Sequence, residues 1–162
     1  MQKTSNQWPL VCQFVEEITL VGRWQSEQWL WQDIFLSLTD AQRDLSLEYL
    51  HLVESSSPRT AQSLAVLELF KDERTDYRFN LSSGQPKLFF ALSFNDTNSL
   101  PKPVQITASQ VVAACYMDTD YLVLSMDMPL AIQAWMEAYM TKHGELIEVK
   151  KKKYKGAGRA KS

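Results

Sequence analysis

Residues that could carry out nucleophilic chemistry are few and widely spaced. A Ser, Cys or Thr nucleophile needs a neighbouring base, usually histidine, and the chain has only His51 and His143. Its two cysteines, Cys12 and Cys115, each lie within an apolar segment. We predict two reduced thiols in the core. A disulfide, a redox pair, or a pairing of Cys12 with His51 or of Cys115 with His143 are the alternatives.

Carboxylates offer one candidate metal site. One residue separates Asp118 from Asp120, so the two carboxylates could share a face and hold Mg²⁺ or Ca²⁺. We favour a solvated loop, because a calcium site needs more oxygen ligands. The short Cys and His spacings of zinc sites do not occur. Glu16 and Glu17 are adjacent in a predicted strand and point to opposite faces, so they make a poor acid–base pair.

Glycine spacing argues against a phosphate-binding loop. Dinucleotide fingerprints place closely spaced glycines between a strand and a helix, so that backbone amides can approach the pyrophosphate. Only Gly156 and Gly158 of the five glycines are close together, and they lie within a lysine-rich tail. We therefore predict no cofactor.

Three tryptophans, Trp24, Trp29 and Trp31, fall within eight residues. Tryptophan is prominent at interface hot spots, because it buries a large area at low entropic cost. Trp29 and Trp31 lie on one side of an extended chain, and we favour a core position for both. Trp24 follows Gly22-Arg23 in a predicted turn. Trp24 and Trp29 are the candidate partner-binding residues of the body.

The net charge of −2 conceals an asymmetry. Residues 150–162 contain seven basic and no acidic residues, whereas residues 1–149 carry a net charge of −9. The lysines repel one another, so we expect a disordered tail. Such a tail could dock onto an acidic protein, bind nucleic-acid phosphates, fold back over the acidic body or aid solubility. Its candidate binding residues are Lys150, Lys151, Lys152, Lys153, Lys155 and Arg159.

Strand-like segments dominate the first two thirds of the chain. β-Branched and aromatic residues favour strands at 11–21, 29–38, 63–71, 77–81, 87–94 and 121–126, and a further strand at 145–150. The turn-forming residues 82–86 predict a hairpin over 77–94. Residues 40–53 fit either a helix or a strand. We favour a helical turn, with Thr39 and Gln42 as its capping box, leading into a short strand.

Two helices are expected in the last third, at about 108–117 and 129–143. Thr107 and Gln110 have the spacing of a capping box for the first. Pro129 suits the start of the second helix and Gly144 suits its end. The predicted fold is α+β, with an antiparallel sheet, which could be strongly curved, packed on one face by both helices.

The length of 162 residues fits one α+β domain, residues 1–149, followed by the basic tail, residues 150–162. No apolar run approaches 18 residues, so no membrane span is predicted. The polar N-terminus lacks the apolar region of a secretory signal, and we expect a cytoplasmic protein.

Three blocks of sequence carry a family resemblance: residues 22–29, residues 67–69 through 77–81 to 85–88, and residues 104–109 with 126–129 and Trp135, ending at His143 and the lysines. In this order they resemble an uncharacterised bacterial family of unknown function, whose members are often encoded beside molybdenum-dependent formate dehydrogenases. The chain departs from the family at Gln110, where the family usually has proline. The resemblance implies no catalytic residues. It implies an accessory role in the assembly or operation of a molybdoenzyme.

The sequence thus predicts a non-catalytic accessory protein whose partner is a molybdoenzyme subunit or its assembly machinery. One alternative is a nucleic-acid-binding protein that uses the basic tail. Another is an enzyme of unrecognised type.

Overall fold

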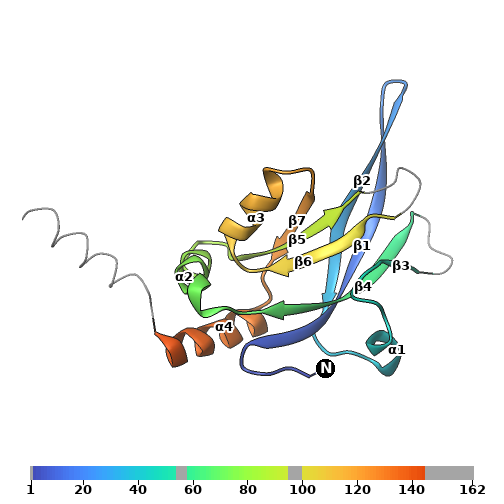
Figure 1. Cartoon of the computed structure of the whole chain (residues 1–162). Coiled ribbons are helices and arrows are strands. Elements are labelled where there is room, and N and C mark those ends of the chain that lie inside the picture. The colour runs from blue at the N-terminus through green and yellow to red at the C-terminus, as the bar shows by residue number, and fades with distance from the viewer. Residues whose placement is uncertain (1, 54–57, 95–99, 145–162) are drawn as a thin grey trace, which may run out of the picture.

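The computed structural model describes residues 2–53, 58–94 and 100–144, and it has an α+β architecture with two antiparallel sheets (Figure 1). The predicted fold class is confirmed. The elements in chain order are β1 (Gln7–Val21), β2 (Trp24–Phe35), α1 (Asp40–Arg43), β3 (His51–Leu52), β4 (Thr60–Glu68), the 3₁₀ turn η1 (Lys71–Glu73), α2 (Arg74–Leu81), β5 (Lys87–Ser93), β6 (Lys102–Thr107), α3 (Gln110–Met117), β7 (Leu122–Asp127) and α4 (Leu130–His143).

The larger sheet has the strand order β2-β1-β4-β3 and the smaller sheet has the order β6-β5-β7. Alternate residues of β1 point inward, because successive side chains of a strand face opposite sides. Phe14 of β1 is fully buried, and its ring lies 5.0 Å from that of Phe90 on β5. Trp31 of β2 contacts the same Phe90 ring at 5.6 Å. Aromatic side chains therefore join the two sheets into one core.

The helices cover different parts of this core. α3 packs against the three-stranded sheet. α4 buries the predicted apolar stripe, which consists of Ile132, Trp135, Met136, Tyr139 and Met140. Trp135 forms an edge-to-face contact at 5.4 Å with Trp8, near the start of β1. The positive φ of 81° at Gly144, which ends α4, confirms the predicted cap.

The predicted hairpin over residues 77–94 is wrong, because residues 77–81 belong to α2. The buried side chain of Asn80 holds this helix in place. Its amide nitrogen donates to the carbonyls of Lys87 and Ala108, both at 2.8 Å, and its oxygen accepts from the Lys87 amide at 3.0 Å. These contacts link the last turn of α2 to β5 and to the start of α3. Local strand propensity is overridden by tertiary contacts.

The start of α3 also differs from the prediction. Ser109, not Thr107, is the N-cap, and its hydroxyl accepts from the Val112 amide at 3.1 Å. Thr107 instead ends β6, a strand that the sequence did not predict.

The predicted capping box at the start of α1 is confirmed, as is the short strand that follows, β3. The Thr39 hydroxyl accepts from the Gln42 amide, and the Gln42 side chain accepts from the Thr39 amide. The predicted strand at 145–150 and the basic tail lie outside the described residues.

Candidate functional site

The β1–β2 hairpin extends beyond the strand that supports it. β4 accompanies β1 only as far as Val15, which faces Thr60. The β1–β2 pairing continues to Val21, which faces Trp24. Residues 17–28, which we call the projecting hairpin, have no third strand beside them in the described part of the chain, and they stand clear of its other elements in Figure 1. A two-stranded ribbon is at best marginally stable in water, so contact with a partner would stabilise it.

The tip of the projecting hairpin is a two-residue turn made of Gly22 and Arg23. Gly22 has a φ of 65°. Hairpins with two-residue loops need positive φ at this first central position, which glycine adopts without steric cost. The predicted turn before Trp24 is therefore confirmed.

Large apolar side chains are exposed on both faces of the projecting hairpin. Val21 and Trp24 face each other across the strands, so they share one face, with exposed fractions of 66% and 79%. Ile18 and Leu20 lie on the opposite face and are 52% and 72% exposed. Clusters of exposed large apolar side chains are typical of protein interaction sites.

An ion pair between the buried Glu16 and the exposed Arg59 lies at the root of the projecting hairpin. Arg59 donates to both carboxylate oxygens of Glu16, at 2.7 and 3.0 Å. These hydrogen bonds are the main reason that the pKa of the Glu16 carboxyl lies below its ordinary value. The Arg59 guanidinium also lies 5.6 Å from the ring centre of Trp29. These contacts hold the ribbon against the start of β4 and so set the direction in which it projects.

The family model described as "Protein of unknown function (DUF3305)" matches residues 11–153. The chain belongs to this family. The match contains the whole projecting hairpin, and it confirms the resemblance to a family of unknown function. No curated protein and no solved structure matches the chain. The association with formate dehydrogenases stays a prediction.

The structure separates the predicted partner-binding residues of this DUF3305 member. Trp24 lies at the exposed tip of the projecting hairpin, whereas Trp29 is only 5% exposed and packs at its root. Trp31 is buried as well. The predicted tail residues Lys150, Lys151, Lys152, Lys153, Lys155 and Arg159 lie outside the described residues.

The cysteines and histidines are not brought together. Cys12 is buried, and burial raises the pKa of its thiol. Cys115 is exposed on α3, so its predicted core position is wrong. It occupies the solvent side of a short helix that buries Ala113 instead. The His51 ring accepts a hydrogen bond from the Ser46 amide, and the His143 ring lies 4.5 Å from the Tyr139 ring in a tilted arrangement.

The two carboxylates of the candidate metal site lie in a solvent-exposed loop, as we predicted. Asp118 and Asp120 are exposed in the turn between α3 and β7. Among the residues that the structure describes, no group of three or more His, Cys, Asp or Glu side chains could hold a metal ion. Glu16 is buried and the adjacent Glu17 is exposed, which confirms that they point to opposite faces.

No helix in the described ranges 2–53, 58–94 and 100–144 is long and apolar enough to cross a membrane.

Sequence reasoning did not identify Ile18, Leu20 and Val21 as surface residues. They continue an apolar strand and look like core residues. The available signal was the pair Glu16-Glu17, which interrupts the apolar pattern at the point where the supporting strand ends.

Proposed function

We propose that this protein is a non-catalytic accessory protein that docks onto a partner protein through its projecting hairpin. The observation that carries the proposal is the exposure of four large apolar side chains on a ribbon that has no third strand among the described residues: Ile18, Leu20, Val21 and Trp24. Such side chains are suited to contact rather than to proton transfer.

The geometry supports insertion of the ribbon into a cleft. Because both faces carry apolar side chains, a flat partner surface would cover only Val21 and Trp24, or only Ile18 and Leu20. A cleft would bury both faces at once. The Glu16–Arg59 pair orients the ribbon before contact, which lowers the entropic cost of binding.

The partner we propose is a subunit of a molybdenum-dependent formate dehydrogenase, or its assembly machinery. This assignment rests on the resemblance carried by residues 22–29, 67–88 and 104–135. The first of these blocks includes the tip of the projecting hairpin and Trp24.

The test is a pull-down with the tagged full chain from a lysate of the organism that encodes it. The hairpin variant replaces Leu20 and Trp24 with serine, which removes one large apolar side chain from each face. The matched control is Leu130→Ser, because Leu130 is 80% exposed on α4, a helix at the opposite end of the fold from the hairpin tip in Figure 1. Each sample is examined for formate dehydrogenase subunits by mass spectrometry at low and high salt.

We expect the wild-type chain and Leu130→Ser to recover a formate dehydrogenase subunit and the double hairpin variant to lose it. Recovery should persist at high salt, because the contact is apolar. Absence of any formate dehydrogenase subunit or assembly factor would refute the proposed partner. Equal recovery by the hairpin variant would refute the hairpin as the docking element.

A further inference from the structure

The outer edge of β1 in the projecting hairpin offers backbone groups for pairing with another strand. The Glu16 amide donates to the Arg59 carbonyl, so the backbone groups of Glu16 point away from β2. Backbone groups alternate in direction along a strand, so the N–H and C=O groups of Ile18 and Leu20 point away from β2 as well. In the described part of the chain, no strand lies beside β1 beyond Val15 on this side. The hairpin therefore presents an open strand edge.

The residues of this edge favour strand pairing. Residues 17–21 include Ile18, Thr19 and Val21, and β-branched side chains favour strands. Natural proteins protect open edges with lysine, proline or bulges. Residues 17–21 contain no lysine and no proline, and the pairing of β1 with β2 is regular from Phe14 to the turn. The edge therefore lacks the usual protection against another strand.

A second copy of the same edge pairs best in one antiparallel register. Hydrogen bonds form between residues whose backbone groups face each other, so Ile18 and Leu20 must face even-numbered residues of the second copy. A register with Ile18 opposite Leu20 brings the turn of the second copy beside Glu16. Arg59 already occupies that position, because its carbonyl accepts from the Glu16 amide. The next register places Leu20 opposite Leu20 of the second copy, and it gives the longest overlap that leaves Arg59 in place.

Charge complementarity supports the same register. With Leu20 at the centre, Glu17 faces Arg23 of the second copy, just beyond the turn residue Gly22. Both charged side chains are exposed, and neither forms an ion pair among the residues that the structure describes. The two-fold symmetry forms the Glu17–Arg23 pair twice. Opposite charges that face each other across neighbouring strands stabilise the pairing.

The pairing also covers exposed apolar side chains on both faces of the projecting hairpin. On one face, Leu20, which is 72% exposed in the single chain, lies directly beside Leu20 of the second copy. On the other face, the exposed Val21 lies beside Thr19 of the second copy. The Cβ atoms of directly opposite residues on paired strands lie about 4.5–5.5 Å apart, so these side chains make contact.

The pairing joins two ribbons into one four-stranded antiparallel sheet with the strand order β2-β1-β1-β2. A two-stranded ribbon is at best marginally stable in water, whereas three or more strands with an apolar face can be stable. The two β1 strands run in opposite directions and meet near their tips. The rest of each chain therefore lies at an opposite end of the shared sheet, because the hairpin projects away from the other described elements (Figure 1).

We propose that two copies of this protein form a two-fold symmetric dimer in which their β1 edges pair in antiparallel orientation, with Leu20 at the symmetry axis. Both copies contribute the same surface, as in most homodimers. The occupant is a second copy because one chain carries both halves of the Glu17–Arg23 pair. Trp24 lies on β2, away from the paired edge, so it stays available to another protein. The dimer therefore neither requires nor excludes the docking contact proposed above.

The test is sedimentation velocity of the purified full chain at increasing protein concentration, with no other protein present. The paired edge is short, so we expect a weak dimer with a Kd on the order of 100 µM. Leu20→Glu places two carboxylates opposite each other and should raise the Kd at least about tenfold. The matched control Gln25→Glu adds the same charge on the same face, because Gln25 faces Leu20 from β2. It lies away from the paired edge and should change the Kd less than about twofold.

Charge exchange tests the register. Glu17→Arg and Arg23→Glu each place like charges opposite each other, and each should raise the Kd about tenfold. Combining both substitutions in one chain restores opposite charges and should return the Kd to the wild-type value. The replaced residues are exposed, so the variants should keep the fold.

The proposal would be overturned by a wild-type chain that remains monomeric at about 1 mM. Association that Leu20→Glu does not weaken, such as contacts made by the basic tail, would also overturn it. Equal weakening by Gln25→Glu would place the contact on the β2 edge or attribute it to net charge. A double charge exchange that does not recover the dimer would exclude the register centred on Leu20.

Discussion

Arg59 binds the Glu16 carboxylate next to the last residue pair between β1 and β4. The guanidinium donates to both carboxylate oxygens, and the Arg59 carbonyl accepts from the Glu16 amide at 2.8 Å. The same two residues therefore end the supported part of the sheet and begin the projecting hairpin.

Replacement of Arg59 by Met should lower the free energy of unfolding by about 1–2 kcal/mol, because Glu16 stays buried without its donors. The cost is modest because the Arg59 side chain is itself 44% exposed. Lys87→Met is the control, since it removes an exposed ion pair with Asp127 that should contribute less than about 0.5 kcal/mol. Urea unfolding of both variants measures the difference. An equal loss in the two would contradict a special role for the Glu16 pair.

The contribution of the same pair should depend on pH. Folding lowers the pKa of Glu16 below its ordinary value of 4.5. The stabilisation is therefore complete above about pH 4.5 and is lost as the pH falls through the folded-state pKa. The wild-type minus Glu16→Gln difference in unfolding free energy should shrink as the pH falls below 4.5. A difference that stays constant from neutral to acidic pH would contradict this assignment.

The turn at Gly22 should not tolerate a branched side chain. A Cβ there would meet nothing within 4 Å, but the φ of 65° strains any L-residue other than glycine. Gly22→Val should open the projecting hairpin at a cost of about 1–2 kcal/mol. Amide hydrogen exchange of residues 17–28 measures the opening. Gly84→Val is the control, because Gly84 does not have positive φ and has similar open space.

Asn80 should be one of the most sensitive polar positions. Asn80→Ala leaves the amide and carbonyl of Lys87 and the carbonyl of Ala108 without this partner. We expect a loss of about 2–4 kcal/mol in urea unfolding. Phe79→Ala on the same helix removes a side chain that is 69% exposed, and should change stability by less than about 0.5 kcal/mol. Similar losses in both variants would show that α2 depends on its apolar surface instead.

Binding of nucleic acid by the basic tail can be tested by truncation after Val149. If the seven basic residues of the tail bound single-stranded DNA, log K would fall with log salt with a slope of up to about −5. We expect at most weak binding, because the acidic body repels phosphate. Fluorescence anisotropy measures the DNA affinity of the full and truncated chains at several salt concentrations. Tight, salt-sensitive binding that the truncation abolishes would favour the nucleic-acid alternative.

Patterns that depend on neighbours within one helical turn were predictable. The Thr39–Gln42 capping box, the buried stripe of α4 and the positive φ of Gly144 all occur as expected. In each case the pattern itself is set by residues within about four positions of one another, so the sequence shows it, although the residues that cover the α4 stripe, such as Trp8, are distant in sequence.

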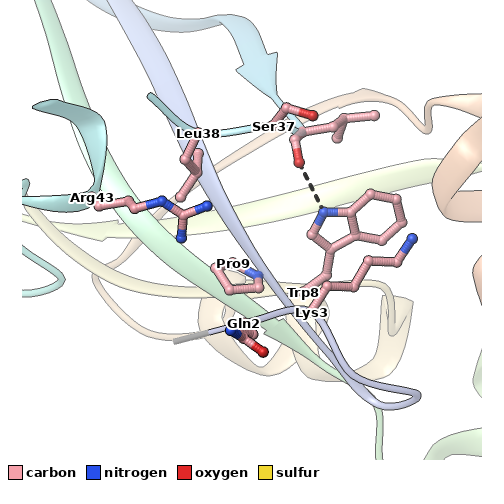
Figure 2. Close-up of a pocket in the computed structure, with 8 residues that line it drawn as sticks. Gln2, Lys3, Trp8, Pro9, Ser37, Leu38 and Arg43 are labelled. Atoms are coloured by element: carbon pink, nitrogen blue, oxygen red, sulfur yellow. Dashed lines mark hydrogen bonds between the residues drawn. The ribbon is translucent and has the colours of Figure 1, made fainter. Parts of the chain in front are cut away.

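Patterns completed by distant residues were not predictable. The Asn80 side chain anchors α2 to Lys87 and Ala108, which lie 7 and 28 residues away. The pocket at the start of β1 (Figure 2) unites Gln2, Lys3, Trp8, Pro9, residues 36–38 and Arg43, and no linear motif marks them. The strand β6 was not predicted, because its residues lie between a polar loop and the residues that predict the start of α3.

Residue order alone was enough to predict the α+β class, the turn that exposes Trp24 and the charge asymmetry of the chain. It could not show that Ile18, Leu20 and Val21 would be exposed, because an apolar strand looks the same whether or not another strand lies beside it. That outcome required the folded chain, in which β4 begins opposite Val15 and no third strand of the described residues lies beside the rest of the ribbon. Side-chain alternation belongs to one strand, whereas burial depends on what packs beside it.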